Sequence, residues 1–169
     1  MSPATLRLPL AAAALGLALG AAAQAPTARQ ETSMSTYQST GPFDVALAPQ
    51  PLSAVAEKTG LGRMSLDKHF HGDLEAASQG EMLSFRDASG QSGGYVALET
   101  VRGTLRGRAG SFVFQHSSTM TRGVPAQSIT VVPDSGTGEL AGLSGRMEVV
   151  IGAGGAHSYR FDYTLPDAH

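Results

Sequence analysis

The sequence predicts an all-β protein built as a single closed antiparallel β-barrel of about eight strands, with at most one short helix. Apolar residues recur at every second position from about residue 40 onward, and turn-forming residues separate these runs at hairpin spacing. Glycine is abundant, at 21 of 169 residues, and Gly80, Gly103 and Gly138 lie in strand-like runs, which suits the strong coiling of a small barrel. Closure also removes exposed sheet edges from a chain in which only 15% of residues are charged.

The predicted elements follow one another along residues 40–165. Alternating apolar positions identify the first strands, at Phe43, Val45 and Leu47 and then at Met64, Leu66 and Phe70. Later strands, rich in Val, Ile, Tyr, Phe and Thr, are predicted over residues 95–105, 111–118, 127–132, 146–151 and 159–165. Turn signals lie at residues 87–90, 106–110, 134–136 and 152–155, and the one helical stretch is predicted at 52–59.

Residues 1–23 are typical of a cleaved secretory signal peptide, because Arg7 precedes a run of Leu and Ala that ends in small residues. Cleavage is expected after Ala23. Cleavage after Ala25 is an alternative that places Pro26 directly behind the cut, and an uncleaved membrane anchor is the alternative to a signal peptide. Residues 24–38 are polar and are expected to form a flexible tether, followed by the barrel domain at 39–167. We therefore expect a periplasmic or secreted protein without a stable membrane anchor after cleavage.

Composition excludes several classes of function. The formal net charge of −2 offers no field for binding nucleic acid. The absence of Cys excludes disulfides, thiolate metal sites and a cysteine nucleophile, so packing alone has to stabilise the fold. No cofactor is expected, since the glycines at Gly136, Gly138 and Gly142 are not followed by a helix that could bind a phosphate.

Three segments resemble a known family. Residues 72–75 (GDLE), 110–116 (GSFVFQH) and 131–143 (VVPDSGTGELAGL) look like the blocks of a bacterial family catalogued as domain of unknown function 3224. The resemblance covers about residues 40–165. It implies a barrel similar to allene oxide cyclase, of the broad calycin-like kind, and leaves the biochemical function open. Allene oxide cyclase is understood to hold its ligand in a cavity with a Glu near the reacting group, but no motif maps that residue onto this chain.

A carboxylate and an imidazole are expected to meet inside the barrel. If Arg106 pairs with Ala109 across a two-residue turn, Glu99 lies opposite His116, and both share a face with Tyr95, Val101, Phe112 and Phe114, the ligand-lining candidates. Glu81 joins them if Arg86 pairs with Gly94. Such a group is the candidate catalytic set, because interacting titratable groups in an apolar site shift one another's pKa values. A structural cross-strand pair, or two solvated side chains, is the alternative.

His69, His71 and Glu75 form an H-x-H-x3-E pattern that resembles the first half of a cupin metal site. No second cupin motif follows, and His71-Gly72-Asp73 also fits a turn. Exposed histidines at a hairpin end are therefore the favoured interpretation, and no metal is expected.

Three functions remain open. The favoured one is an exported barrel that binds a small apolar or amphipathic molecule without transforming it, since a small barrel can hold one such ligand. The second is an isomerase or cyclase that acts on this ligand with Glu99, Glu81 or His116 as acid–base groups. The third is a non-catalytic interaction or oligomerisation module, for instance a homo-oligomer.

Overall fold

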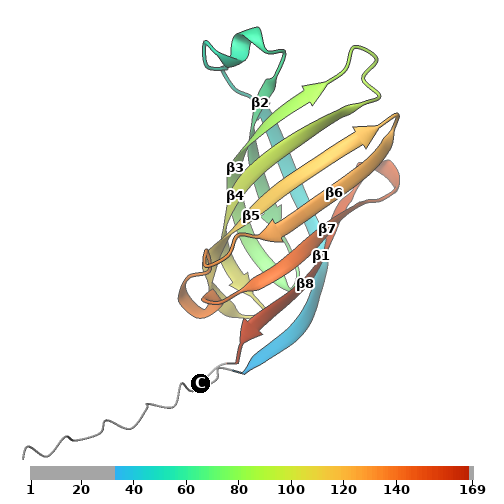
Figure 1. Cartoon of the computed structure of the whole chain (residues 1–169). Coiled ribbons are helices and arrows are strands. Elements are labelled where there is room, and N and C mark those ends of the chain that lie inside the picture. Colours follow the sequence, from blue (N-terminus) through green and yellow to red (C-terminus); the bar gives the residue numbers. More distant parts are fainter. Residues whose placement is uncertain (1–32, 168–169) are drawn as a thin grey trace, which may run out of the picture. The chain divides into compact units, whose positions relative to one another are not determined.

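A computed structural model describes residues 33–167 of the chain and contains the eight-stranded, all-β closed barrel that the sequence predicts (Figure 1). The strands are β1 (Met34–Pro49), β2 (Gly62–Phe70), β3 (Leu74–Arg86), β4 (Gly93–Leu105), β5 (Arg108–Thr121), β6 (Val124–Val131), β7 (Ser144–Ile151) and β8 (His157–Pro166). Each strand pairs antiparallel with the next, and β1 pairs with β8 to close the barrel.

Helical structure in the described residues is limited to three 3-10 turns, η1 (Ala56–Lys58), η2 (Gly138–Leu140) and η3 (Ala153–Gly155). The predicted helix at 52–59 is thus reduced to η1, and Gly138 lies in η2 rather than in a strand. Within residues 33–167 no helix is long and apolar enough to cross a membrane.

The barrel begins earlier than predicted. β1 starts at Met34, and Met34 pairs with Pro166 at the far end of β8. Residues 34–38 therefore belong to a strand and not to a tether, because backbone pairing with β8 orders a segment that has no strong apolar pattern. The predicted signal peptide at 1–23, its cleavage site and the tether up to residue 32 lie outside the described residues.

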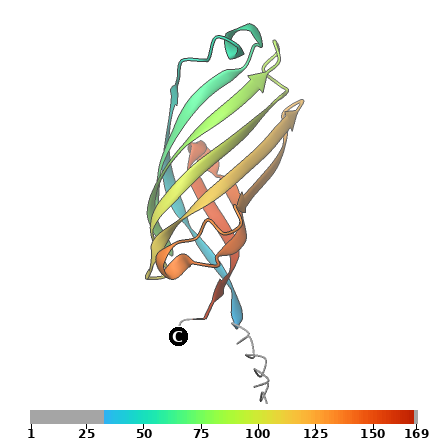
Figure 2. The same ribbon diagram turned by 60° about the vertical axis from the view of Figure 1, so that its left-hand side comes forward.

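The two ends of the barrel interior differ. At the end where β2 and β8 finish, large apolar and aromatic side chains fill the core, among them Phe70, Leu105, Phe112, Phe161 and Leu165. The opposite end, where β1, β3, β5 and β7 finish and the β3–β4 and β5–β6 hairpins turn, is here called the mouth (Figures 1 and 2). The closed core thus forms a floor beneath the mouth.

The junction between β6 and β7 is the weakest part of the barrel wall. These strands share only the pairs Ile129 with Met147 and Thr130 with Arg146, and both views show them diverging toward the mouth (Figures 1 and 2). There the side-chain Oε1 of Gln127 accepts a hydrogen bond from the backbone N of Val149 at 3.1 Å. A side chain therefore replaces the backbone ladder at this seam.

Candidate functional site

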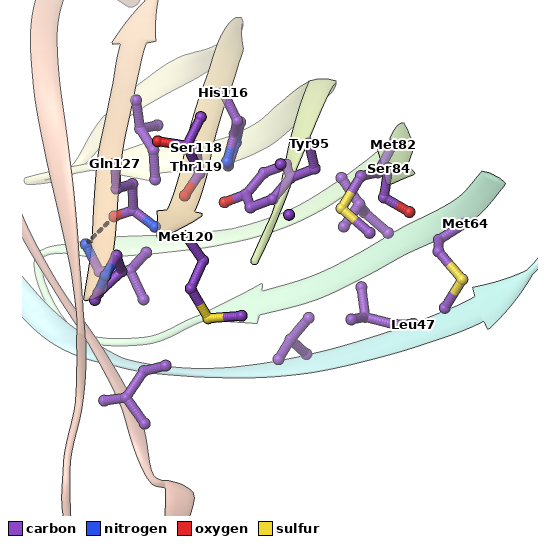
Figure 3. Close-up of a pocket in the computed structure, with 18 of the residues that line it drawn as sticks. Leu47, Met64, Met82, Ser84, Tyr95, His116, Ser118, Thr119, Met120 and Gln127 are labelled. Carbon is purple, nitrogen blue, oxygen red and sulfur yellow. Dashed lines mark hydrogen bonds between the residues drawn. The ribbon is translucent and has the colours of Figure 1, made fainter. Parts of the chain in front are cut away.

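A cavity of about 650 Å³ occupies the mouth half of the barrel (Figure 3). This volume is typical of sites for small molecules. Its wall is largely apolar and includes several flexible methionines, and its polar groups include Tyr95, Ser118, Thr119, Gln127, His157 and, at the end of β3, Arg86. Residues that line it include Phe43, Val45, Leu47, Met64, Leu66, Lys68, Met82, Ser84, Tyr95, His116, Ser118, Met120, Gln127, Ile129 and Val149.

Four buried polar side chains lie between the cavity and the apolar floor, and we call them the polar layer: Lys68 of β2, Ser78 of β3, Glu99 of β4 and His116 of β5. Lys68 Nζ lies 2.9 Å from Oε1 and 2.8 Å from Oε2 of Glu99. His116 Nε2 lies 3.0 Å from Oε1, and Ser78 Oγ donates to Oε2 at 3.2 Å. Lys68 and His116 line the cavity, with Glu99 behind them at 1% exposure.

Small residues of β3 allow this cluster to form. β3 lies between β2 and β4, where Ser78 pairs with Lys68 and Gly80 pairs with Glu99. A Cβ atom on Gly80 would lie only 2.2 Å from the carbonyl oxygen of Leu98 and 2.6 Å from Cα of Glu99. The long Lys68 side chain can therefore reach over β3 to the carboxylate on the next strand.

The surroundings of Glu99 favour its ionised form. Burial by itself would raise the pKa of the carboxyl, but the hydrogen bond from His116 and the charge of Lys68 outweigh burial and hold the pKa below its ordinary value. Lys68 Nζ also lies 5.6 Å from the centre of the Phe43 ring and 5.8 Å from that of Phe70, within the range of cation–π attraction. The ion pair is thus packed as well as hydrogen-bonded.

Tyr95 lies in the cavity wall above the polar layer, with Ser118 and Gln127 nearby (Figure 3). Burial, with the charge of Glu99, raises the pKa of the Tyr95 phenol, although hydrogen bonds with Gln127 and Ser118 oppose the shift. The phenol is therefore neutral near pH 7 and supplies a polar group without charge.

The expected pairing of β4 with β5 is wrong by two positions. Leu105 pairs with Arg108, so Glu99 lies opposite Phe114, and His116 lies opposite Ala97. The turn residue Arg106 takes a left-handed φ of 48°, which places the turn one residue earlier than predicted. A shift of two positions preserves the face of every side chain, so Glu99 and His116 still meet inside the barrel.

The expected inward position of Glu81 is wrong. Arg86 pairs with Gly93 instead of Gly94, and this shift of one position turns the Glu81 side chain to the outer face. There its carboxylate accepts two hydrogen bonds from Arg63, both at 2.6 Å. Glu81 therefore does not join Glu99 and His116.

The ligand-lining candidates divide into two groups. Tyr95 lines the cavity, whereas Val101, Phe112 and Phe114 are packed in the apolar core and are at most 1% exposed. They lie on the expected inner face but below the polar layer. Strand alternation predicts which face a residue occupies, but not the depth at which the core ends and the cavity begins.

The three weak metal candidates do not all come together. His69 points outward from β2, while His71 lies in the turn after β2, 3.1 Å from Asp44 and 3.6 Å from Glu75. Within residues 33–167 no group of three His, Cys, Asp or Glu side chains could hold a metal ion. Glu75 is exposed and His71 is partly exposed at this hairpin end.

Two members of the polar layer, Lys68 and Ser78, were not identified from the sequence. The sequence pattern could have identified Lys68. It is separated from Met64, Leu66 and Phe70 by an even number of positions, so its side chain lies on the same inward face of the strand. A charged residue at such a position needs a buried partner. Ser78 likewise alternates with Leu74 and Ala76 on the inward face of β3.

Comparisons with known proteins agree with this architecture. A family model described as protein of unknown function (DUF3224) matches residues 39–163. A solved structure of a DUF3224 protein of unknown function from Shewanella oneidensis MR-1 is 49% identical, with a TM-score of 0.73, and the match covers 79% of this chain and 100% of that one. No curated protein matches the chain. The family match and the structural neighbour together show that the chain belongs to the DUF3224 family.

Proposed function

We propose that this protein binds a small apolar or amphipathic molecule in the barrel cavity and does not transform it. The observation that carries the proposal is the cavity of about 650 Å³, whose wall is mostly apolar and whose base holds Lys68 and His116. A largely apolar pocket with a few convergent polar groups is the usual form of a small-molecule site. A barrel that acted only through its surface would need no such space.

Exposed apolar side chains around the mouth support the same proposal. Leu47, Phe85, Val124 and Ile151 lie near the strand ends that surround the mouth, and each is at least half exposed. Exposed apolar groups beside a cavity are common at ligand-binding sites. They would help an apolar molecule leave water and enter the barrel.

The polar layer favours binding over acid–base catalysis. Glu99 lies behind Lys68 and His116 and is already contacted by three donor side chains. Its lowered pKa does not suit a general acid near neutral pH. A catalytic mechanism with two neighbouring carboxylates is also not supported, because Glu81 lies on the outer face of the barrel.

We further propose that the protein works outside the cytoplasm, in the periplasm or after secretion. The proposal rests on the signal-like pattern of residues 1–23. Terminal sequencing of the protein purified from the envelope and medium fractions would test it. A mature chain that begins at Gln24 supports export, and a cytoplasmic chain that retains Met1 contradicts it.

Binding is tested with a neutral apolar dye, N-phenylnaphthylamine, titrated into the purified mature chain. The variant Ser118→Trp places a large side chain in the cavity, whereas Ser117→Trp places it on the outer face of the same strand. The wild-type chain has no Trp, so each variant also carries a single fluorescence reporter at a known place.

We expect Ser118→Trp to weaken dye binding by about tenfold or more, which corresponds to about 1.4 kcal/mol, and Ser117→Trp to leave it unchanged. Native mass spectrometry of the wild-type protein should also show a co-purifying apolar molecule. A wild-type chain that binds no dye and carries no such molecule would contradict the proposal.

A further inference from the structure

Lys68 and His116 of the polar layer have hydrogen-bonding groups that are not used within the layer, whereas Glu99 has none. A carboxylate offers about four lone-pair sites. Each Glu99 oxygen already has two close donor contacts, Lys68 with His116 at Oε1 and Lys68 with Ser78 at Oε2. Glu99 therefore cannot accept a further hydrogen bond from a ligand.

The free groups are one N–H of Lys68 and Nδ1 of His116. A lysine ammonium has about three N–H donors, and contacts with the two Glu99 oxygens occupy two of them. The bond between His116 and the ionised Glu99 uses Nε2–H, and within the described residues Nδ1 of His116 has no hydrogen-bond partner. Nδ1 then accepts a hydrogen bond when the ring is neutral and donates one when the ring is protonated.

We propose that the ligand is an amphiphile with a carboxylic acid head group, which accepts a hydrogen bond from Lys68 Nζ and shares one proton with His116 Nδ1. The inference rests on the proposed function, because it assigns the head group of the molecule that fills the cavity. The apolar part of the ligand lies toward the mouth, against the flexible side chains of Met64, Met82 and Met120.

The charge balance of the layer requires this proton. Lys68 and Glu99 carry opposite charges that cancel. Arg86, the other cation in the cavity lining, is an exposed residue at the end of β3 by the mouth, away from the polar layer. A carboxylate that entered the base of the cavity alone would therefore leave one negative charge there without a neighbouring cation to balance it, which is costly. One proton taken from solvent restores neutrality, whether it resides on the ligand as COOH beside a neutral imidazole or on Nδ1 beside COO⁻.

The groups packed around His116 are an ion pair, a neutral phenol and apolar side chains. Lys68 from β2 and Glu99 from β4 face it as an ion pair, and Tyr95 of β4 is a neutral phenol in the adjacent wall. Phe114 from its own strand contacts the ring edge-to-face, and Ile129 pairs with it from β6. His157, which packs on Phe43 elsewhere in the cavity, is a second imidazole and requires a control.

The experiment compares decanoate, decanol and decylamine as probes, by isothermal titration calorimetry with the purified mature chain. Titrations near pH 7.5 in two buffers with different ionisation enthalpies measure the protons taken up on binding. We expect decanoate to bind about tenfold or more tightly than the other two, a difference of about 1.4 kcal/mol, with uptake of close to one proton.

Variants separate the roles of the individual groups. His116→Gln keeps a donor for Glu99 but removes the Nδ1 that shares the proton with the ligand, so decanoate binding should weaken about tenfold or more and the preference for decanoate over decanol should shrink. His157→Gln should retain both the preference and the uptake. The double variant Lys68→Met/Glu99→Gln leaves no buried charge and should lose the preference for decanoate while still binding N-phenylnaphthylamine.

The outcomes distinguish this inference from the function on which it rests. If decanol binds as tightly as decanoate, or if no proton is taken up, the head-group assignment is overturned, while dye binding preserves the proposed cavity function. The assignment also falls if none of the amphiphiles binds to a chain that binds the dye. A chain that binds neither dye nor amphiphile contradicts both proposals.

Discussion

Lys68→Met is the substitution that tests the energetics of the polar layer most directly. It removes the cation that contacts both oxygens of Glu99, and it leaves Ser78 and His116 as the remaining donors to a carboxylate that is 1% exposed. Loss of one partner of a buried ion pair costs about 3–5 kcal/mol, because the other charge stays buried without compensation. That is a large part of the roughly 5–15 kcal/mol by which a domain is stable.

The double variant Lys68→Met/Glu99→Gln should recover most of this loss. The introduced methionine side chain would pack against the rings of Phe43 and Phe70, which Lys68 contacts now, and the introduced glutamine amide would keep polar contacts with Ser78 and His116. A buried ion pair replaced by neutral side chains of similar volume is often close to neutral in stability. We expect the double variant to lie within about 2 kcal/mol of the wild type.

The assay is urea unfolding at pH 7, followed by far-ultraviolet circular dichroism of the purified mature chain. Lys58→Met in the exposed η1 turn is the control and should change stability by less than about 0.5 kcal/mol. A loss below about 1 kcal/mol for Lys68→Met would refute the reasoning, as would a double variant no more stable than the single one. If Lys68→Met does not fold at all, the recovery of folding in the double variant still decides the question.

Three further predictions concern pH, close packing and an unpaired hydroxyl. The pKa of Glu99 is lower in the folded than in the unfolded chain. Ionised Glu99 therefore contributes its full stabilisation of the fold above the ordinary Glu pKa of about 4.3, and this contribution is lost as the pH falls through the pKa of the folded state. Urea midpoints of the wild type should therefore decline toward those of Lys68→Met/Glu99→Gln below about pH 4, and a constant difference down to about pH 2 would contradict this. Gly80→Ala should destabilise the barrel by about 1–3 kcal/mol, since the added Cβ meets the backbone of β4. The control Gly152→Ala should be nearly neutral, because its Cβ has no contact closer than 3.6 Å. Equal thermal midpoints for the two variants would count against the packing argument. Ser39→Ala should stabilise the protein by about 1 kcal/mol, because the buried Ser39 Oγ has no hydrogen-bond partner among the described residues, and a lower thermal midpoint would argue otherwise.

The alternation of side chains between the two faces of each strand explains which parts of the site could be predicted from the sequence. An error of two positions between β4 and β5 left Glu99 and His116 on the inner face, because side chains alternate with a period of two. An error of one position between β3 and β4 moved Glu81 outside. The length of a hairpin loop decides between these outcomes, and a run of turn-forming residues does not determine that length.

The contact between Lys68 and Glu99, which spans the intervening strand β3, could not be predicted for a different reason. Lys68 and Glu99 are on strands that do not pair with each other, and they meet only because β3 presents Ser78 and Gly80 between them. An interpretation based on pairs of adjacent strands does not consider such neighbours. The eight-stranded barrel itself was predictable, because alternation and turn residues are local signals that agree along the whole domain.

The seam between β6 and β7 means that this barrel wall is not uniformly stable. Besides their two paired positions, the two strands are joined by side-chain hydrogen bonds, from Arg146 to Ser128 and from Val149 N to Gln127. Local opening there breaks few bonds, so its free energy is lower than that of global unfolding, and backbone amides at the seam should exchange with solvent faster than those of β3 and β4. The part of β6 that has no partner on β7 carries Pro125, which lacks an N–H and so discourages the addition of a foreign strand. Local opening of the barrel wall is therefore expected beside the cavity, at a strand edge that Pro125 protects in part.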